Sequence, residues 1–260
     1  MKTLAVLPAR FASTRFPGKP LALIAGKPMI QWVWEAAQKA GVDKVVVATD
    51  DDRIATAVSA FGGQVVLTDP ALSSGTDRVA ATMVALDKLG ERFDTVLNIQ
   101  GDEPAMRSET IVAVVELMAQ TPELPMATAA CPFYHRDDIF SPNNVKVVVD
   151  STNRALYFSR SPIPYLRSSS CFDMDFRAWM TDEQLSLFRC HLGIYAYRPD
   201  VLRRFTSLPP HPLEEAEKLE QLRALAAGIT IGVAPTLHPS MGVDIPEDVA
   251  RVKVMLENSR

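Results

Sequence analysis

The sequence predicts an α/β protein with a three-layer, doubly wound, mostly parallel mixed sheet. Short β-prone runs alternate with helical patterns four times between residues 3 and 119, and this alternation is typical of parallel sheets covered by helices on both faces. The run Lys44–Thr49 is almost continuously apolar, as expected for a strand that is buried on both faces. Ligands of such sheets bind beyond the carboxyl ends of the strands. The loops that follow strands are therefore where a site is expected.

The first four strand–helix units can be followed in order along the chain. The first β-prone run ends at Pro8, and Pro28 suits the first turn of the helix that follows. Acidic residues open the second helix, where they favour the positive end of its dipole. The predicted strands are Thr3–Leu7, Lys44–Thr49, Gln64–Leu67 and Asp94–Gln100. The predicted helices are Pro28–Ala37, Asp51–Phe61, Thr76–Leu89 and Glu109–Ala119.

Beyond Ala119 the alternation changes. Two β-prone runs, Met126–Cys131 and Val145–Val149, are followed by the Ser- and Pro-rich stretch Ser159–Leu185, which predicts an irregular excursion from the sheet. Regular patterning returns with predicted strands at Cys190–Tyr197 and Ile229–Val233 and predicted helices at Leu213–Ala227 and Pro246–Leu256. Because these units complete the first sheet, we expect one domain over residues 1–260.

The composition excludes several function classes. The chain has 260 residues, 47% of them apolar, and its 27 basic against 31 acidic side chains give a net charge of −4. With no run of cations, binding to the nucleic-acid backbone is not expected. Three cysteines without a CxxC spacing indicate neither a disulfide framework nor a zinc site. No stretch approaches the ~18 apolar residues of a membrane span, and the N-terminal apolar run is too short for a signal sequence. We therefore expect a cytoplasmic protein without membrane insertion.

The loop after the first strand carries three cations, Arg10, Arg15 and Lys19, together with two hydroxyl side chains and Gly18. Cations neutralise phosphate charge, and a glycine lets main-chain N–H groups approach an anion closely. The loop therefore predicts a polyphosphate cradle, with a solvated surface loop as the alternative. It is neither a Walker A sequence nor a dinucleotide fingerprint, since the chain contains no GxG.

Carboxylates follow the fourth strand and also precede the last helix. The pair Asp102 and Glu103 comes directly after Gly101, and Asp244 stands shortly before the helix that Pro246 opens. Hard oxygen ligands of this kind suit Mg²⁺, which usually takes one or two carboxylates plus substrate phosphates. We predict a Mg²⁺ site at Asp102 and Asp244, with a turn or capping role as the alternative for each.

Other polar clusters have two interpretations each. Ser74, Gly75, Thr76 and Arg78 could cap a helix or read a base through hydroxyl and main-chain groups. Arg160 could hold a carboxylate in a bidentate pair. Glu217, Glu220 and Gln221 would share one face of a helix, and a polar helical face usually contacts solvent. His191 is either a hydrogen-bonded core residue or part of a site.

Taken in order, the motifs resemble the CMP-Kdo synthetases, the 3-deoxy-manno-octulosonate cytidylyltransferases, over nearly the whole chain. Single motifs occur in many sugar nucleotidyltransferases, but the ordered set is specific to this family and its close variants. The motifs are Pro8–Arg10, Arg15–Leu21, Gly26–Ile30, Ala48–Asp50, Ser74–Arg78, Asn98–Pro104, Asn144–Val148, Tyr157–Arg160, His191–Tyr195, Leu219–Arg223 and Gly242–Asp244.

The resemblance implies a nucleotidyltransferase, Rossmann-like fold and transfer of CMP from CTP to the anomeric hydroxyl of Kdo, an eight-carbon acidic sugar, for lipopolysaccharide biosynthesis. It implies a Mg²⁺-dependent homodimer in which the region 133–188 supplies dimer contacts. By motif position, Lys19, Asp102 and Asp244 would be catalytic, with both aspartates on the metal. The nucleotide would be held by Arg10, Arg15, Lys19, Ser74, Gly75, Thr76 and Arg78. The sugar acid would be held by Gln100, Arg160, His191, Tyr195, Glu220 and Gln221.

The sequence leaves three alternatives open. A cytidylyltransferase for 8-amino-Kdo differs by one amine for one hydroxyl, which needs only a few changed contacts. An enzyme for another acidic sugar or a non-sugar alcohol is the second alternative. The third is a nucleotide-binding regulator without catalysis, because fold alone does not fix activity.

One departure from the family pattern is Ile245, where the family often has Thr.

Overall fold

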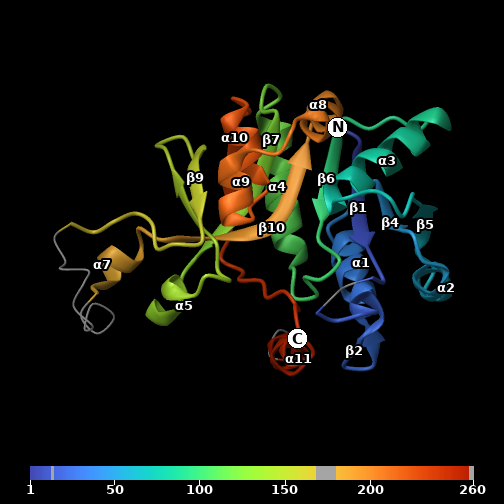
Figure 1. Ribbon diagram of the computed structural model, residues 1–260, viewed down its shortest axis with the longest axis horizontal. Helices are drawn as coiled ribbons and strands as arrows, with labels where there is room; N and C mark the ends of the chain where they lie inside the picture. Colours follow the sequence, from blue (N-terminus) through green and yellow to red (C-terminus); the bar gives the residue numbers. More distant parts are fainter. Residues whose placement is uncertain (13–14, 168–179, 258–260) are drawn as a thin grey trace.

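The computed structural model describes residues 1–12, 15–167 and 180–257. These residues form a nine-stranded mixed sheet flanked by helices (Figure 1). Its main path runs β11-β7-β10-β6-β1-β4-β5. The strands of this path are β1 (Thr3–Ala9), β4 (Lys44–Thr49), β5 (Gln64–Leu67), β6 (Thr95–Ile99), β7 (Met126–Pro132), β10 (Arg189–Tyr197) and β11 (Ile231–Pro235). The predicted fold class is confirmed.

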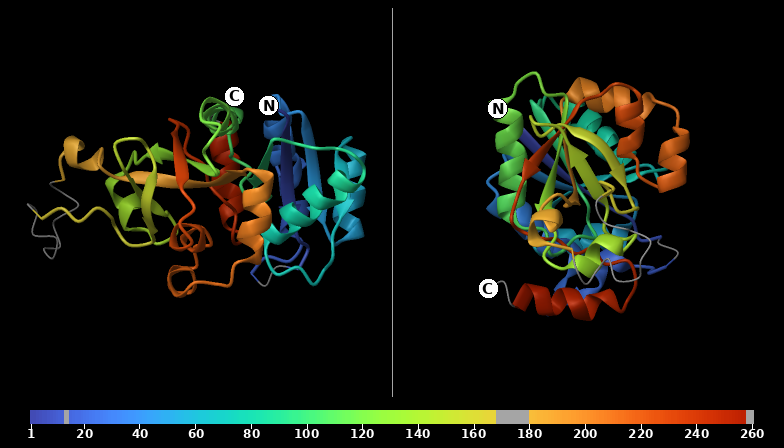
Figure 2. Two further views of the ribbon diagram at one scale, coloured as in Figure 1. Left: turned by 90° about the horizontal axis from the view of Figure 1, so that it is seen from above. Right: turned by 90° about the vertical axis from the view of Figure 1, so that its left-hand side faces the viewer.

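Alternating side chains of β1 show how the two helical layers form. Ala5 and Leu7 pack into one core cluster, whereas Leu4 and Val6 pack into the other. Successive strand residues point to opposite faces, so a continuous apolar run needs cover on both. One face is covered by α1 (Met29–Lys39), α2 (Asp52–Ala60) and α4 (Ser108–Gln120), and the other by α3 (Gly75–Lys88), α8 (Pro199–Ser207) and α10 (Gln221–Ala226). The right-hand view of Figure 2 shows helices on both sides of the strands.

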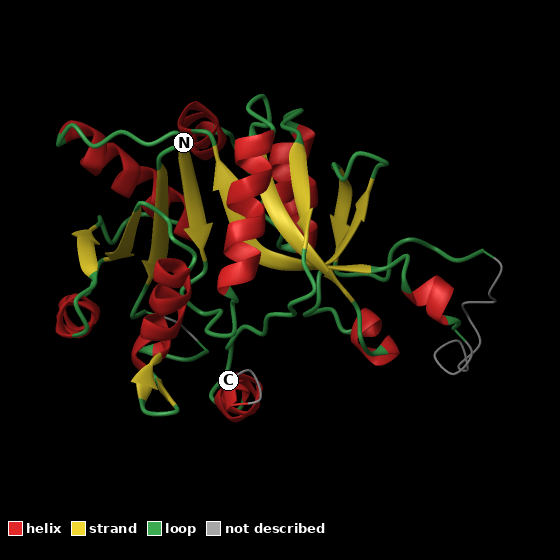
Figure 3. Cartoon of the chain, turned by 180° about the vertical axis from the view of Figure 1, so that it is seen from behind, coloured by secondary structure: helices red, strands yellow, loops and turns green. Residues whose placement is uncertain are grey.

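Parallel pairing defines the functional edge of the sheet. β1 pairs in parallel with both β4 and β6, so the carboxyl ends of these three strands lie at the same edge. β10 runs antiparallel to β6 and β7, and it is one of the long curved strands in Figure 3. Because β10 lies beside β6, its side chains come next to the loop that follows β6.

The predicted excursion leaves the main sheet between β7 and β10. It contains α5 (Arg136–Phe140), β8 (Lys146–Val149), β9 (Ala155–Ser159) and α7 (Asp182–Leu185), which project from one end of the molecule in Figure 1. β9 was not predicted, but it pairs with β8 to form a hairpin. A role in dimer contacts stays a prediction. Ser13, Thr14, Cys171 and the rest of 168–179 lie outside the described residues.

Two helical predictions were wrong in part. The single helix over Leu213–Ala227 is instead α9 (Pro212–Glu217) followed by α10, because Lys218 takes the left-handed conformation at φ 53° and ends α9. The last helix, α11 (Asp248–Glu257), begins two residues after Pro246. α8 was not predicted, although Pro199 stands in its first turn.

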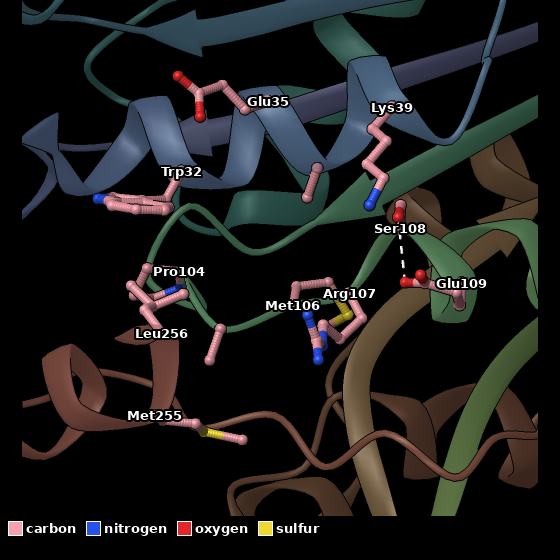
Figure 4. Close-up of a pocket in the computed structure, with 12 residues that line it drawn as sticks. Trp32, Glu35, Lys39, Pro104, Met106, Arg107, Ser108, Glu109, Met255 and Leu256 are labelled. Carbon is pink, nitrogen blue, oxygen red and sulfur yellow. Dashed lines mark hydrogen bonds between the residues drawn. The ribbon is translucent and has the colours of Figure 1, made fainter. Parts of the chain in front are cut away.

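The C-terminal helix packs beside the first one. Val252 of α11 is buried with Ile24 of β2 (Leu23–Ile24) and Met29, close to the short strand β3 (Lys27–Pro28). Figure 4 shows the cavity of about 180 Å³ that remains between α1, the 104–109 loop and Met255. This packing fixes the segment that carries Asp244. Among the described residues, no helix combines the length and apolar character that a membrane crossing requires.

Candidate active site

A cavity of about 360 Å³ opens at the carboxyl edge, where the loops after β1 and β6 meet. The loops approach closely because residue 101 is glycine: a Cβ there would lie 2.7 Å from the main-chain oxygen of Pro8. The lining residues are Pro8, Ala9, Arg10, Ala12, Arg15, Lys19, Pro20, Gly75, Gln100, Gly101 and Asp102. The three predicted cations of the first loop and the first predicted aspartate therefore share one cavity.

Lys19 joins the two aspartates that the sequence singled out. Its Nζ lies 2.6 Å from Oδ2 of Asp102 and 3.8 Å from Oδ1 of Asp244. Arg15 also reaches Asp244, at 3.1 Å. Lys19 begins a short 3₁₀ turn (Lys19–Leu21) after Gly18, whose φ of 71° suits glycine. The lysine is only 13% exposed, so its ammonium is held rather than free to move.

The backbone also fixes Asp244. The N–H of Val243 donates to the main-chain oxygen of Asp102 at 2.9 Å, which ties the two carboxylate-bearing segments together. The carboxylate of Asp248 accepts from the N–H groups of Asp244 and Ile245, at 3.0 and 3.2 Å. Capping of this segment therefore comes from Asp248, which leaves the carboxylate of Asp244 directed to the cations.

The donor set fits a divalent cation that is shared with a substrate. Two carboxylates lie within 4.0 Å of one ammonium, so their oxygens converge on one small volume. Within the described ranges, no group of three or more His, Cys, Asp or Glu residues could hold a metal by itself. Mg²⁺ keeps several non-protein ligands. Asp102 and Asp244 could therefore hold Mg²⁺ when phosphate oxygens or water complete its shell.

Arg10 connects the first loop to the loop before α3. Its guanidinium donates to the main-chain oxygens of Leu72 and Ser73. Ser74 then caps α3, accepting from the N–H of Asp77 at 3.0 Å in a reciprocal capping box. The capping interpretation of Ser74 is thus confirmed. The same contacts bring the amino end of α3 against the cavity, where Gly75 is part of the lining.

A chain of side-chain hydrogen bonds crosses from β6 to the segment before α10. Gln100 donates to Asn98 at 3.2 Å, and Asn98 donates to the hydroxyl of Thr76 at 3.2 Å. That hydroxyl donates to Glu220 at 2.6 Å. Burial raises the pKa of Glu220, while the bond from Thr76 opposes the rise. Four polar side chains from three distant segments are therefore held in one arrangement.

Arg78 lies beneath this arrangement. Its side chain is fully buried, with one guanidinium nitrogen 2.6 Å from Asp50 and another 2.6 Å from Thr68. Burying a charge is costly unless it is paired and hydrogen-bonded. Arg78 thus fixes α3 to the loops after β4 and β5, and any effect on a nucleotide would pass through the position of α3.

Arg160 holds the turn between α9 and α10. Its guanidinium donates to the main-chain oxygens of Glu217, Pro142 and Lys218, at 2.7, 2.8 and 3.4 Å. The carboxylate of Glu217 accepts from Ser159 and from the N–H of Arg160. Since the predicted helix is broken here, Glu217 does not share one helical face with Glu220 and Gln221. Glu217 instead fastens the turn to β9.

His191 and Tyr195 lie on β10 beside the polar chain. Nε2 of His191 is 3.0 Å from the hydroxyl of Thr128, and its ring meets Phe158 edge-on at 5.0 Å between centroids. Burial lowers the pKa of His191 to about 3, so the imidazole is neutral at neutral pH. The ring of Tyr195 follows at 5.5 Å, and burial raises the pKa of its phenol.

Comparison with known proteins places this chain in a family. A family model described as Cytidylyltransferase matches residues 4–231. A 3-deoxy-manno-octulosonate cytidylyltransferase of Syntrophotalea carbinolica is 48% identical over 257 residues, which cover 98% of this chain and 99% of that protein. The chain belongs to the 3-deoxy-manno-octulosonate cytidylyltransferase family. It is therefore an enzyme of the nucleotidyltransferase class.

Further relatives of this cytidylyltransferase agree. The protein of the same name from Parabacteroides distasonis is 46% identical over 262 residues, covering 99% of both chains. A solved structure of CMP:2-keto-3-deoxy-manno-octonic acid synthetase complexed with CTP is 40% identical, with a TM-score of 0.86 and full coverage of both chains. The resemblance inferred from the motifs is confirmed.

Within the cytidylyltransferase site, the structure adds residues that the predicted set of site residues did not include. Glu103 packs against Gly193, where any Cβ would collide with its carboxylate. Burial, together with the charge of Asp102, raises the pKa of Glu103 to about 7. Asn98 donates to Thr76, and Asp50 anchors Arg78 through an ion pair. Glu103 stands in the acidic pair after β6, so its position was visible in the sequence, but its contact with Gly193 of β10 was not.

Gln221 of this cytidylyltransferase is a predicted sugar residue with an unpaired side-chain atom in the part of the chain that the structure describes. It is 4% exposed. Among the described residues, its side-chain nitrogen finds no hydrogen-bond acceptor. A buried polar group without a partner is costly. A ligand oxygen that accepted from Gln221 would remove that cost.

Proposed function

We propose that this chain transfers CMP from CTP to the anomeric hydroxyl of 3-deoxy-manno-octulosonate and releases pyrophosphate. The observation that carries the proposal is the convergence of Asp102 and Asp244 on Lys19 beside a cation-lined cavity. Phosphoryl-type transfer depends on alignment and on neutralisation of charge more than on covalent chemistry. The family membership and the CTP complex of the related synthetase support the same reaction.

The residues divide into a triphosphate side and a base side. Arg10, Arg15 and Lys19 would hold the triphosphate, and Asp102 with Asp244 would hold Mg²⁺. When bound, the ion supplies neutralisation of phosphate charge and a lower pKa for the attacking hydroxyl. The loop Ser74–Thr76 would contact the cytidine, and Arg78 would keep that loop in place.

The sugar acid would lie between the 100–103 loop, β10 and the start of α10. Gln221 has an amide nitrogen free to bind a ligand oxygen, and Glu220 and Gln100 are already joined through Thr76 and Asn98. His191 and Tyr195 would form the aromatic side of this pocket. Arg160 would act on the sugar through the turn it holds. No general base is assigned, and the homodimer and the cytoplasmic location stay predictions.

The direct test is incubation of the purified chain with CTP, Mg²⁺ and the sugar acid, followed by measurement of pyrophosphate and CMP-sugar. Parallel reactions contain Kdo, 8-amino-Kdo or no acceptor. We expect Kdo to give equal amounts of both products, and omission of Mg²⁺ to remove activity. Product with 8-amino-Kdo alone would move the proposal to that sugar. Pyrophosphate release that does not depend on any acceptor would contradict it.

A further inference from the structure

Two cysteines stand opposite each other in the sheet, outside the groups used above. In the antiparallel pairing of β7 with β10, Cys131 is directly opposite Cys190. Directly opposed residues of antiparallel strands carry their side chains on the same face, with Cα atoms about 4.5–5.5 Å apart. This range lies within the Cα separation that a disulfide tolerates. Both cysteines are free thiols.

Cys131 is the more acidic thiol of the pair. Interaction with the Cys190 side chain lowers the pKa of Cys131, whereas the same interaction and burial raise the pKa of Cys190. On the other side of Cys190, Lys146 of β8 is directly opposite it in register. The ammonium of Lys146 donates to three main-chain oxygens. Its charge opposes the rise in the pKa of Cys190, whereas the charge of Glu103 adds to that rise.

A small oxidant has a route to these thiols. A cavity of about 420 Å³ opens beside β7, and Cys131 is one of its lining residues together with Phe188, Arg189 and Thr236. Cys131 itself is only 2% exposed, so bulky thiol reagents are excluded more strongly than peroxide. Cys190 is partly exposed.

We propose that Cys131 and Cys190 form a reversible disulfide across β7 and β10 when a small hydroperoxide is present. The Cys131 thiolate attacks one peroxide oxygen, the O–O bond breaks, and the leaving oxygen takes a proton to become water or an alcohol. The resulting sulfenic acid is attacked by the sulfur of Cys190, whose proton leaves with the hydroxyl as water. Two thiols and one hydroperoxide thus give one disulfide, one alcohol or water, and one water.

The disulfide would fasten the base of the excursion. Everything between β7 and β10, including the β8–β9 hairpin, lies in the loop that it closes. Closure of a loop of this length stabilises a fold mainly by restricting the unfolded chain. The bond would also restrain the segment of β10 that immediately precedes His191. The sequence spacing gave no sign of this pairing, because the two residues become neighbours only in the sheet.

The test uses the reduced full-length chain and hydrogen peroxide. After brief treatment with one equivalent, two of the three cysteine thiols should be lost, and a peptide map without reductant should show Cys131 joined to Cys190. Dithiothreitol should reverse both changes. The oxidised chain should melt about 5 °C or more above the reduced chain.

Variants separate this pair from other thiol chemistry. Cys171→Ser is the matched control and should behave like the unchanged chain, whereas Cys131→Ser and Cys190→Ser should form no internal cross-link. The peptide map of the unchanged chain decides the matter even where a variant folds poorly. A cross-link to Cys171, a cross-link between chains, oxidation to sulfinic acid alone, or no reaction would each overturn the proposal.

Discussion

Asp102 holds its charge on a loop with little freedom, because Gly101 packs against the main chain of Pro8 and Val243 donates to the Asp102 carbonyl. We expect Asp102→Asn to keep the fold and to lower kcat by about 100-fold to 1000-fold, the range typical of lost transition-state electrostatics. The matched control is Asp87→Asn. Asp87 has the same 37% side-chain exposure and an ion pair with Arg203. It lies near the carboxyl end of α3, whereas Gly75 at the amino end lines the cavity. Near-normal turnover of Asp102→Asn would remove the metal assignment.

Arg160 contacts three main-chain oxygens, so its expected role is to position the turn before Glu220 and Gln221. We expect Arg160→Ala to raise KM for the sugar acid by about 10-fold or more, from the loss of charge-assisted hydrogen bonds, with a smaller change in KM for CTP. Steady-state kinetics with each substrate varied in turn measure both constants. Arg203→Ala, which breaks only a surface ion pair, should change neither. Equal changes in both KM values would point to a general loss of structure instead.

His191 makes stability depend on pH in a defined direction. Its pKa is about 3 in the folded chain because of burial, against the ordinary value of 6.5. Between these values His191 is protonated in the unfolded chain and neutral in the folded chain. The contribution of the neutral imidazole to the free energy of unfolding is therefore complete above pH 6.5 and is lost as the pH falls toward 3. The loss is at most roughly 1.4 kcal/mol per pH unit. Urea unfolding of the unchanged chain and His191→Gln should therefore converge in stability at acid pH. Parallel pH profiles would contradict the burial of a neutral imidazole.

At the scale of elements, Lys218 decides where one predicted helix becomes two. Its φ of 53° and ψ of 46° are left-handed, a conformation that costs a non-glycine residue about 1–2 kcal/mol. We expect Lys218→Gly to raise the free energy of unfolding by about 0.5–1 kcal/mol, after subtraction of the entropy that glycine adds to the unfolded chain. Urea unfolding measures this. Lys253→Gly, within α11, should instead lower it by about 1 kcal/mol. A loss of stability in Lys218→Gly would mean that the lysine side chain stabilises the turn.

The elements also show how far sequence patterns reach. Lys44–Thr49 was predicted with the bounds that the structure has, because an apolar run buried on both faces has few alternatives. The bounds of Gln64–Leu67 were also predicted correctly, although this edge strand is partly exposed. The break at Lys218 was missed because helical periodicity continues through it and no glycine or proline marks it. β9 was missed because its pairing with β8 depends on contacts that the local sequence does not encode.

The same limit applies to the site. Arg10, Arg15, Lys19 and Asp102 were predictable because loops after parallel strands converge at one edge. Asp244 was harder, since only tertiary packing of α11 brings it to Lys19. The burial of Arg78 and the close contact of Glu103 were beyond prediction, because they depend on Asp50 and Gly193, which belong to other strands and loops.

For the whole molecule, the ion pairs of Lys19 and Arg15 join the first loop to the segment before the last helix. Without phosphate oxygens, the carboxylates of Asp102 and Asp244 form an incomplete metal shell. In the absence of a metal ion, the same carboxylates neutralise Arg15 and Lys19. CTP and Mg²⁺ should therefore favour each other's binding, as linkage requires.

At 100 times the dissociation constant, a ligand adds about 2.7 kcal/mol of stability, which corresponds to a rise in Tm of roughly 5–10 °C for a chain of this size. We expect the rise in Tm with both ligands to exceed the sum of the two separate rises in scanning fluorimetry. In Asp244→Asn the excess should vanish while the rise with CTP alone persists, because Arg10, Arg15 and Lys19 remain. A purely additive response of the unchanged chain would separate the metal from the nucleotide and contradict a shared site.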